Sequence, residues 1–180
     1  MTSAYLENPV TRETFAFQST DEDAVRLDWF LPPGGSSPEH VHPHQVERVS
    51  GIEGELEIAV RGGDVLRIGA SDVVEIPART PHLFRNVHDQ VAHMTVEFRP
   101  ALEMREFLEM AAGLAKEGKT DKAGRPRNPL QLATFVLGFR HVFYVTRPPL
   151  WVQRLTLTPL AALGRPLGYK RYEEKYRVHR

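Results

Sequence analysis

The stretch GGSSPEHVHPHQVERVSGIEG, residues 34–54, places alternating histidines shortly before a glutamate. Alternate residues of a β-strand point to the same side, so His40 and His42 can reach a single metal ion. Glu47 lies an odd number of residues beyond His42 and would point away from that ion on an unbroken strand. Pro43 resolves the conflict, because proline cannot continue a central ladder and favours a turn. We therefore expect the two histidines to end one strand and Glu47 to open the next.

Two further histidines are candidates for the same ion. His82 follows Pro81 at the predicted start of another strand, and it can complete the set from across the fold. His44 continues the alternation, so on spacing alone it can replace His40 or His42 as a ligand. A single His-x-His pair is weak evidence for a metal site, so the interpretation depends on the full spacing.

Residues 12–98 have the pattern of an all-β domain. Apolar side chains alternate along residues 25–31 and again along 56–60, which is the period of half-buried strands. Gly62 and Gly63 then provide a hairpin signal. Further strands are expected at 65–68, 73–76, 82–86 and 91–98. Many short strands separated by turn signals predict a β-sandwich or barrel.

After Pro100 the apolar period changes to that of a helix. Apolar residues recur every three or four positions in 104–115, and two further helices are expected at 130–145 and 150–163. The latter two are apolar on more than one side, so we expect them to pack on the barrel or on a partner. The alternative is a membrane surface, at which three aromatic residues would lie: Phe143, Tyr144 and Trp151.

These patterns divide the chain into a β-barrel domain, residues 1–100, and an α-helical extension, residues 101–180. Acidic residues outnumber basic ones in the first part, and basic residues outnumber acidic ones in the second. Opposite charges favour docking of the two parts, within one chain or across a dimer, unless both faces are solvated. The basic end is then either a solvated tail or the partner of the acidic barrel: Lys170, Arg171, Lys175, Arg177 and Arg180.

Composition restricts the classes of protein. The formal net charge is zero, which argues against a general nucleic-acid-binding surface. The chain contains no cysteine, so a metal would be bound by imidazole and carboxylate groups. Residues 1–10 do not have the pattern of a signal peptide, and no apolar run is long enough to span a bilayer. We therefore expect a cytoplasmic protein without a transmembrane segment.

The spacing of the candidate ligands resembles the two signatures of the cupin superfamily. The first signature is matched by Gly34, His40, His42, Glu47 and Gly54, and the second by Pro77, His82 and Asn86. The chain is similar to small bacterial single-barrel cupins, some of which carry a helical C-terminal extension. The resemblance implies a mainly β fold, a cupin-type β-jelly roll, often as a homodimer. It also implies a divalent metal ion near one end of a cavity, held by four residues: His40, His42, Glu47 and His82.

Two positions depart from the cupin pattern. Ser71 stands where the family usually has the glycine of a turn, and Arg79 where it has the glycine after proline. Glycine at such positions usually supplies a positive φ, so the departures leave the local turn geometry open. Arg79 can instead serve a surface or a substrate.

Three neutral imidazoles and one carboxylate leave a divalent ion with a net charge of +1 and open coordination positions. This mixed nitrogen and oxygen site suits Fe(II), Mn(II), Ni(II), Co(II), Cu(II) or Zn(II), and the ligand set does not choose among them. Open positions allow O₂ or a bidentate anionic substrate to bind, or a water to be activated. The residual charge favours carboxylates, enolates or catechol-like diols.

Three polar residues near the predicted site are weaker candidates for catalysis. Asn86 shares a strand face with His82, so it can orient a ligand or simply satisfy backbone groups at the strand end. His93 and Glu97 lie on the polar face of their strand, and either can act as general acid or base if that face lines the cavity. The alternative is that the face is solvated.

Three classes of function remain. The first is a metal-dependent enzyme acting on a small organic molecule: a dioxygenase, or an isomerase, cyclase or lyase that uses the ion as Lewis acid. The second is a module that binds or senses a metal-chelating metabolite without turnover. The third is a ligand-sensing regulator whose helices bind DNA, but residues 130–163 lack an exposed basic face. We favour the enzyme, with a preference for oxygen-dependent chemistry, because such sites suit Fe(II).

Overall fold

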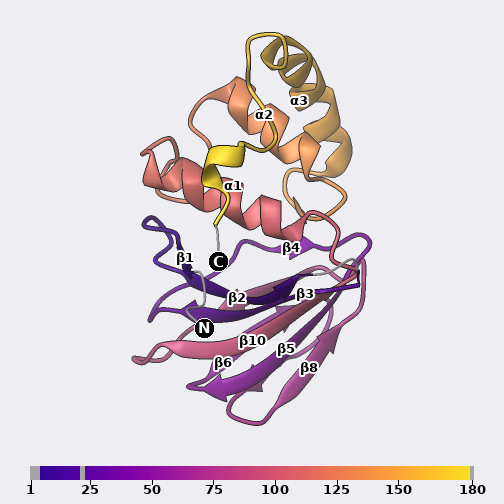
Figure 1. Ribbon diagram of the computed structural model, residues 1–180. Helices are drawn as coiled ribbons and strands as arrows, with labels where there is room; N and C mark the ends of the chain where they lie inside the picture. The colour runs from indigo at the N-terminus through magenta and orange to yellow at the C-terminus, as the bar shows by residue number, and fades with distance from the viewer. Residues whose placement is uncertain (1–4, 21–22, 179–180) are drawn as a thin grey trace.

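The computed structural model describes residues 5–20 and 23–178 of the chain. They form two antiparallel sheets, with a helical layer on one end (Figure 1). The larger sheet has the strand order β1-β2-β3-β10-β5-β8, and the smaller has β11-β4-β9-β6-β7. The strands are β1 (Tyr5–Glu7), β2 (Thr14–Thr20), β3 (Val25–Leu31), β4 (His40–Val41), β5 (Val46–Glu53), β6 (Leu56–Val60), β7 (Val65–Ile68), β8 (Val73–Ile76), β9 (His82–Arg85), β10 (Ala92–Arg99) and β11 (Tyr144–Val145). The two antiparallel sheets form a β-jelly roll, as the sequence predicts.

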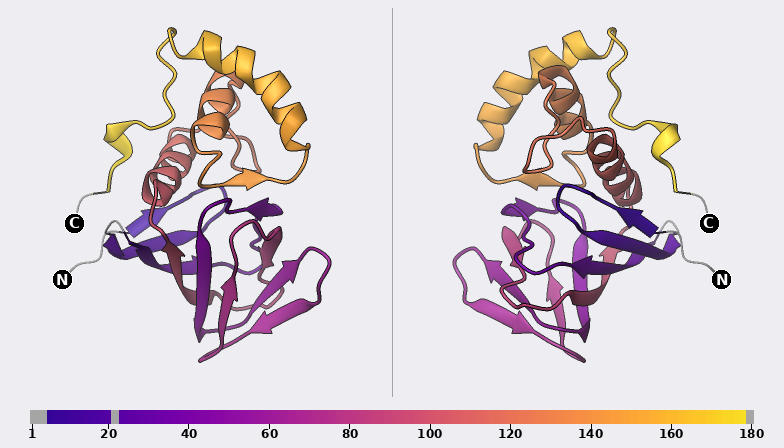
Figure 2. Two further views of the ribbon diagram at one scale, coloured as in Figure 1. Left: turned by 90° about the vertical axis from the view of Figure 1, so that its right-hand side faces the viewer. Right: turned by 90° about the vertical axis from the view of Figure 1, so that its left-hand side faces the viewer.

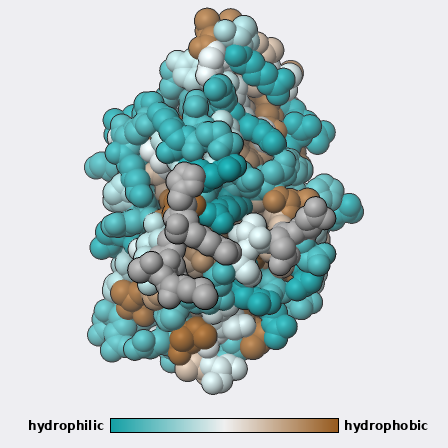
Figure 3. Space-filling view, viewed as in Figure 1, coloured by the Kyte–Doolittle hydropathy of each residue, from teal (hydrophilic) through white to brown (hydrophobic). Residues whose placement is uncertain are grey.

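The helices follow the barrel in sequence and lie together at one end of it (Figure 2). None of the described helices is long and apolar enough to cross a membrane. The face of the molecule in Figure 3 is mainly hydrophilic, with scattered apolar residues. The helices are α1 (Met104–Lys116), α2 (Pro129–Gly138), α3 (Leu150–Gly164) and a short 3-10 helix (Glu174–Tyr176).

Strict alternation of side chains builds the core of the barrel. In β3, Val25, Leu27, Trp29 and Leu31 are buried and the residues between them are exposed or partly exposed. The central strand β10 alternates in the same way and pairs with both β3 and β5. Because strands such as β3 and β10 turn one face inward, the two sheets enclose an apolar core, and the predicted period-two pattern is confirmed in these strands.

The predicted helix at 130–145 is wrong in its second half. Helix α2 begins after Asn128, whose side chain accepts hydrogen bonds from two backbone N–H groups, and it ends at Gly138. The chain then turns, and Tyr144 and Val145 form β11, which pairs with Val41 and His40 of β4. Pairing with the sheet outweighs the local helical pattern, because tertiary hydrogen bonds can override propensity.

The barrel and the extension share one hydrophobic core. That cluster contains barrel residues such as Leu27 and Phe84 together with Met110 of α1 and Phe139 after α2. Gln45 strengthens the junction, since its side-chain amide donates to the carbonyls of Pro100 and Ala101 at 3.0 and 2.9 Å. Burial against a common core therefore places the helices directly on the barrel.

The described part of the basic C-terminal segment, up to residue 178, is docked on α1 and is not a free tail, whereas Arg180 lies outside the described residues. Buried Glu109 of α1 accepts a hydrogen bond from the Tyr172 hydroxyl at 2.7 Å and another from the Val178 N–H at 3.0 Å. Lys175 adds an ion pair with Glu117 at 2.6 Å. The partner of the segment is thus α1, whereas the sequence offered the acidic barrel or solvent as alternatives. Figure 1 shows the yellow segment crossing this helix.

Both departures from the cupin pattern keep the turn that glycine would make. Ser71 has φ 71° and Arg79 has φ 68°. Backbone hydrogen bonds hold both residues in place, from Ser71 N to the Gly51 carbonyl at 3.0 Å and from Arg79 N to the His42 carbonyl at 2.9 Å. A non-glycine residue in the left-handed region costs about 1–2 kcal/mol. The surrounding structure therefore imposes the turn on unfavourable residues.

We expect Ser71→Gly to stabilise the protein by roughly 0.5–1 kcal/mol, because glycine tolerates the positive φ at the cost of some unfolded-state entropy. The measurement is the free energy of unfolding in urea, at constant metal content. Ser50→Gly is the control, since Ser50 lies within β5, and glycine inside a strand should destabilise. A loss of stability in Ser71→Gly would contradict the assignment of strain to this turn.

Candidate metal centre

Four buried side chains from both sheets meet at one end of the barrel. His40 of β4 is the direct cross-strand partner of His82 of β9, and His42 follows β4 immediately. Glu47 is the second residue of β5 in the opposite sheet. One ligand atom from each residue lies within 4.8 Å of the others. The histidines therefore end one strand and Glu47 opens the next, as predicted.

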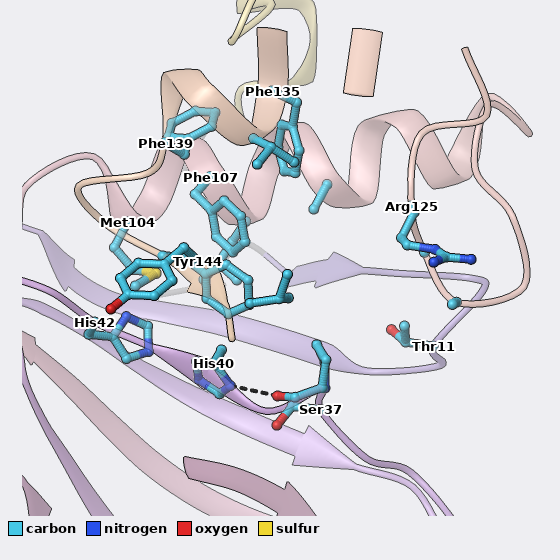
Figure 4. A pocket seen from close by; sticks show the side chains of 18 of the residues that line it. Thr11, Ser37, His40, His42, Met104, Phe107, Arg125, Phe135, Phe139 and Tyr144 are labelled. Atoms are coloured by element: carbon cyan, nitrogen blue, oxygen red, sulfur yellow. Dashed lines mark hydrogen bonds between the residues drawn. The ribbon is translucent and has the colours of Figure 1, made fainter. Parts of the chain in front are cut away.

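All three histidines turn the same ring nitrogen away from the centre. Each Nδ1 lies within hydrogen-bond distance of a backbone carbonyl, which fixes the tautomer and leaves Nε2 with a lone pair for the centre. The dashed line from His40 in Figure 4 is one of these bonds. The pairs are His40 with Pro38 at 2.8 Å, His42 with Val142 at 2.8 Å, and His82 with Thr80 at 2.9 Å.

The spacing of the donor atoms fits a divalent ion. Ligand atoms about 2.1 Å from a metal lie roughly 3 Å apart when they are neighbours and about 4.2 Å apart when they are opposite. Glu47 Oε2 lies 2.9 Å from His82 Nε2 and 3.4 Å from His42 Nε2. Three imidazoles and a carboxylate suit a transition-metal ion. The cluster is therefore compatible with such an ion, and its composition does not name the element.

Electrostatics favours the forms that bind a metal at two of the residues. Burial lowers the pKa of His40 well below its ordinary value, which keeps the ring neutral. Burial alone would raise the pKa of Glu47, but hydrogen bonds with His42 and His82 outweigh it and lower that pKa. The pKa of His82 is raised because its hydrogen bond to Glu47 outweighs burial. A bound ion would displace the proton that the raised pKa favours on His82.

The extension takes part in the centre directly. Val142, in the segment after α2, supplies the carbonyl that orients His42. The ring of Phe143 stacks on His40 with 4.7 Å between centroids and on Phe107 of α1 at 4.8 Å. Strand β11 then adds to the edge of β4. Two of the four candidate ligands thus depend on residues about a hundred positions away in the sequence.

A cavity of about 480 Å³ lies between the barrel and the helices. His40, His42 and Glu47 face it, whereas His82 lies outside its lining. The remaining walls are mainly apolar, with aromatic side chains from the barrel and from the helices. They include Phe15, Trp29, Phe84, Phe98, Met104, Phe107, Phe135, Phe139 and Phe143. Figure 4 shows those on the helical side, such as Phe107, Phe135 and Phe139.

The cavity also has a polar end, formed by the loop before β2 and the loop after α1. Thr11, Glu13 and Arg125 line it, and Figure 4 shows Thr11 and Arg125 well away from His40 and His42. Burial raises the pKa of Glu13, which accepts a hydrogen bond from the Trp29 indole at 3.1 Å. The buried Thr11 hydroxyl lies beside the Glu13 carboxyl, and its hydrogen bond opposes the effect of burial on that pKa. This end can therefore bind a polar group on an otherwise apolar ligand.

The weaker sequence candidates do not join the cluster. Asn86 is buried, but its amide donates to the carbonyls of Leu31 and Gln90, so it organises the backbone. His93 stacks on Phe30 and lies 3.3 Å from Asp28 on the other face of the sheet.

Glu97 is on that same outer face and pairs with Arg26 and Arg99. Neither His93 nor Glu97 lines the cavity, because β10 turns its apolar face inward, so the condition for their acid–base roles is not met. His44 is exposed and lies outside the cluster.

Comparison with known proteins agrees with this geometry. Residues 27–98 match the family model of the cupin domain. This barrel is a cupin domain. The cupin match ends just before the helical extension begins, so the family describes the barrel and the four clustered residues within it.

Individual relatives resemble parts of this chain. A "Polyketide synthase CurC" of Streptomyces cyaneus is 37% identical over 70 residues, which is 39% of this chain and 45% of that protein. An uncharacterized protein with a double-stranded β-helix domain from Klebsiella pneumoniae is 24% identical, with a TM-score of 0.45, over 49% of this chain and 76% of its own. The lyase DddQ from Ruegeria pomeroyi is 28% identical, with a TM-score of 0.43, over 47% of this chain and 42% of its own.

We expect His82→Ala and Glu47→Gln each to abolish stoichiometric metal binding, because each removes a donor from a buried four-ligand set. The measurement is elemental analysis of protein purified without a metal-chelating tag. His93→Ala is the control, since His93 lies on the outer face of β10. Unchanged metal content in His82→Ala would show that the ligand assignment is wrong.

We expect Phe143→Ala to weaken metal affinity roughly 10–100-fold, because the change removes the ring that stacks on His40, and outer partners of metal ligands have effects of this size. Phe30→Ala is the matched control, since Phe30 also stacks on a histidine, His93, but outside the cluster. Metal affinity is measured by competition with a chromophoric chelator. Equal affinities of the two variants would contradict a role of the extension in the centre.

Proposed function

We propose that this protein is a divalent-metal-dependent enzyme that acts on a mainly apolar organic molecule with a chelating, anionic oxygen group. One observation carries the proposal: an aromatic cavity of about 480 Å³ opens onto His40, His42 and Glu47. A cavity of this volume suits a ligand of drug-like size. The alternative is a binding module without turnover.

The four candidate ligands and the aromatic walls of the cavity would have different roles. His40, His42, Glu47 and His82 would hold the ion, and an ion with open positions supplies Lewis acidity or a binding site for O₂. Because His82 lies outside the cavity lining, the substrate would approach from the side of the other ligands. Phe107 and the other aromatic walls bind the apolar body and exclude water, which strengthens electrostatic interactions at the centre.

The substrate's chemistry follows from the two ends of the cavity. Chelating oxygens, as in an enolised 1,3-dicarbonyl or a catechol, match the residual charge of an ion bound by three imidazoles and one carboxylate. A second polar group of the substrate would lie near Thr11 and Glu13 at the other end. The curated relative described as a polyketide synthase supports a substrate of the 1,3-dicarbonyl class.

The reaction class depends on the metal. Histidine and carboxylate ligation with open positions suits Fe(II) and oxygen-dependent chemistry, so this class is the first to test. Zinc or nickel would favour isomerisation, cyclisation or elimination with the ion as Lewis acid. A purely structural metal site would be coordinatively closed, so the open side of this centre supports an enzyme.

We expect benzoylacetone, an aryl 1,3-dicarbonyl, to perturb the visible spectrum of the Co(II)-substituted protein, because its oxygens would enter the coordination sphere. Ala111→Phe should weaken this binding at least tenfold without loss of metal, since Ala111 lines the cavity and a phenyl group would fill part of it. Ala162→Phe is the control, because Ala162 is exposed on α3.

An unperturbed spectrum would disprove metal-anchored binding. Turnover is followed separately, by product analysis of aryl 1,3-dicarbonyls and catechols with iron-loaded protein in air and with zinc-loaded protein without oxygen. Tight binding with no product under either condition would favour the binding module over the enzyme.

A further inference from the structure

A second cavity, of about 300 Å³, lies beside the first and shares Val136, Tyr144 and Gln153 with its lining. Arg79 reaches it from the loop between β8 and β9, Arg140 from the end of α2 and Arg154 from α3. His44 and His141 also line it, and no aspartate or glutamate does, although His141 pairs with Glu103 at 2.6 Å just outside the lining. The barrel and the extension together thus form a small cationic cavity.

The arginines of this cavity lack the carboxylate partners found elsewhere in the protein. Arg61 pairs with Glu39, for example. Among the described residues, none of the acidic side chains forms an ion pair with Arg79, Arg140 or Arg154. Three guanidinium groups around one cavity repel one another, so the arrangement favours an anion between them.

Arg79 lines this cavity and has an unfavourable backbone conformation. Its φ of 68° lies in the region that favours glycine, and its N–H donates to the His42 carbonyl. Strained residues of this kind cluster at ligand-binding sites, where the surrounding structure holds them in place. Glycine would make the same turn without strain but would leave the cavity without its barrel-side charge.

We propose that this cavity binds a phosphoryl group, such as that of a phosphate monoester. The guanidinium group of an arginine donates two parallel hydrogen bonds to two oxygens of a phosphate. Several arginines can each bind a different pair of these oxygens. A carboxylate has one such pair and would leave two of the three arginines uncompensated. Tyr144 and Gln153 line both cavities, so the phosphoryl group would lie next to the proposed substrate cavity. The inference does not depend on the proposed reaction.

The test is a calorimetric titration of the metal-loaded full chain with inorganic phosphate at constant ionic strength. We expect saturable binding at one site, and at least tenfold weaker binding in Arg79→Gly and in Arg154→Ala. Arg79→Gly should fold well, because glycine tolerates the positive φ. Arg48→Ala is the matched control, since Arg48 is exposed on β5 outside either cavity and should leave phosphate affinity unchanged.

Two results would overturn the proposal. Equal phosphate affinity in the wild type, Arg79→Gly and Arg154→Ala would do so, as would a loss in Arg48→Ala as large as in the other two. Phosphate bound to the metal itself would give the first result, because neither change removes a proposed ligand. Metal content, measured in every variant, distinguishes failure of this site from failure of the metal centre. Simultaneous binding of phosphate and benzoylacetone would assign a separate phosphorylated molecule, and competition would assign the phosphoryl group to the substrate.

Discussion

The orientation of three imidazole rings is the constraint on which the rest of the structure depends. Each ring has its Nδ1 at a backbone carbonyl, and only this arrangement leaves all three Nε2 atoms for one centre beside Glu47. The carbonyls come from three separate segments, before β4, before β9 and after α2. The ligands are therefore held by the whole fold, and binding of an ion would in turn stabilise the fold.

The helical extension changes what a jelly-roll barrel can bind. Helices alone would only cover the open end of the sheets, but here the segment after α2 turns back and pairs with β4. This pairing brings the Val142 carbonyl and the Phe143 ring against two histidines. Helix α1 and its neighbours then form the other half of the aromatic cavity. The barrel thus supplies the charged centre, and the extension supplies much of the apolar volume above it.

The two cavities suit different chemical groups of a ligand. One is apolar and ends at the histidines and Glu47, whereas the other is small and lined by three arginines. Tyr144 and Gln153 stand between them, and the Gln153 amide is engaged by the carbonyls of Val145 and Pro148. Burial of apolar surface contributes binding affinity but does not fix the orientation of a ligand, whereas hydrogen bonds to charged groups do. Together they can place a large ligand in one orientation.

The homodimer and the cytoplasmic location stay predictions.

The sequence by itself determined the features that depend on short separations along the chain. The strand period, the break at Pro43 and the spacing of the four candidate ligands all predict what the structure contains. Only the tertiary structure decided that residues 144–145 leave the helical pattern, that β10 turns His93 outward and that Val142 reaches His42. Periodicity describes which residues share a face within one element. It carries no information on contacts a hundred residues apart, because those depend on how the elements pack.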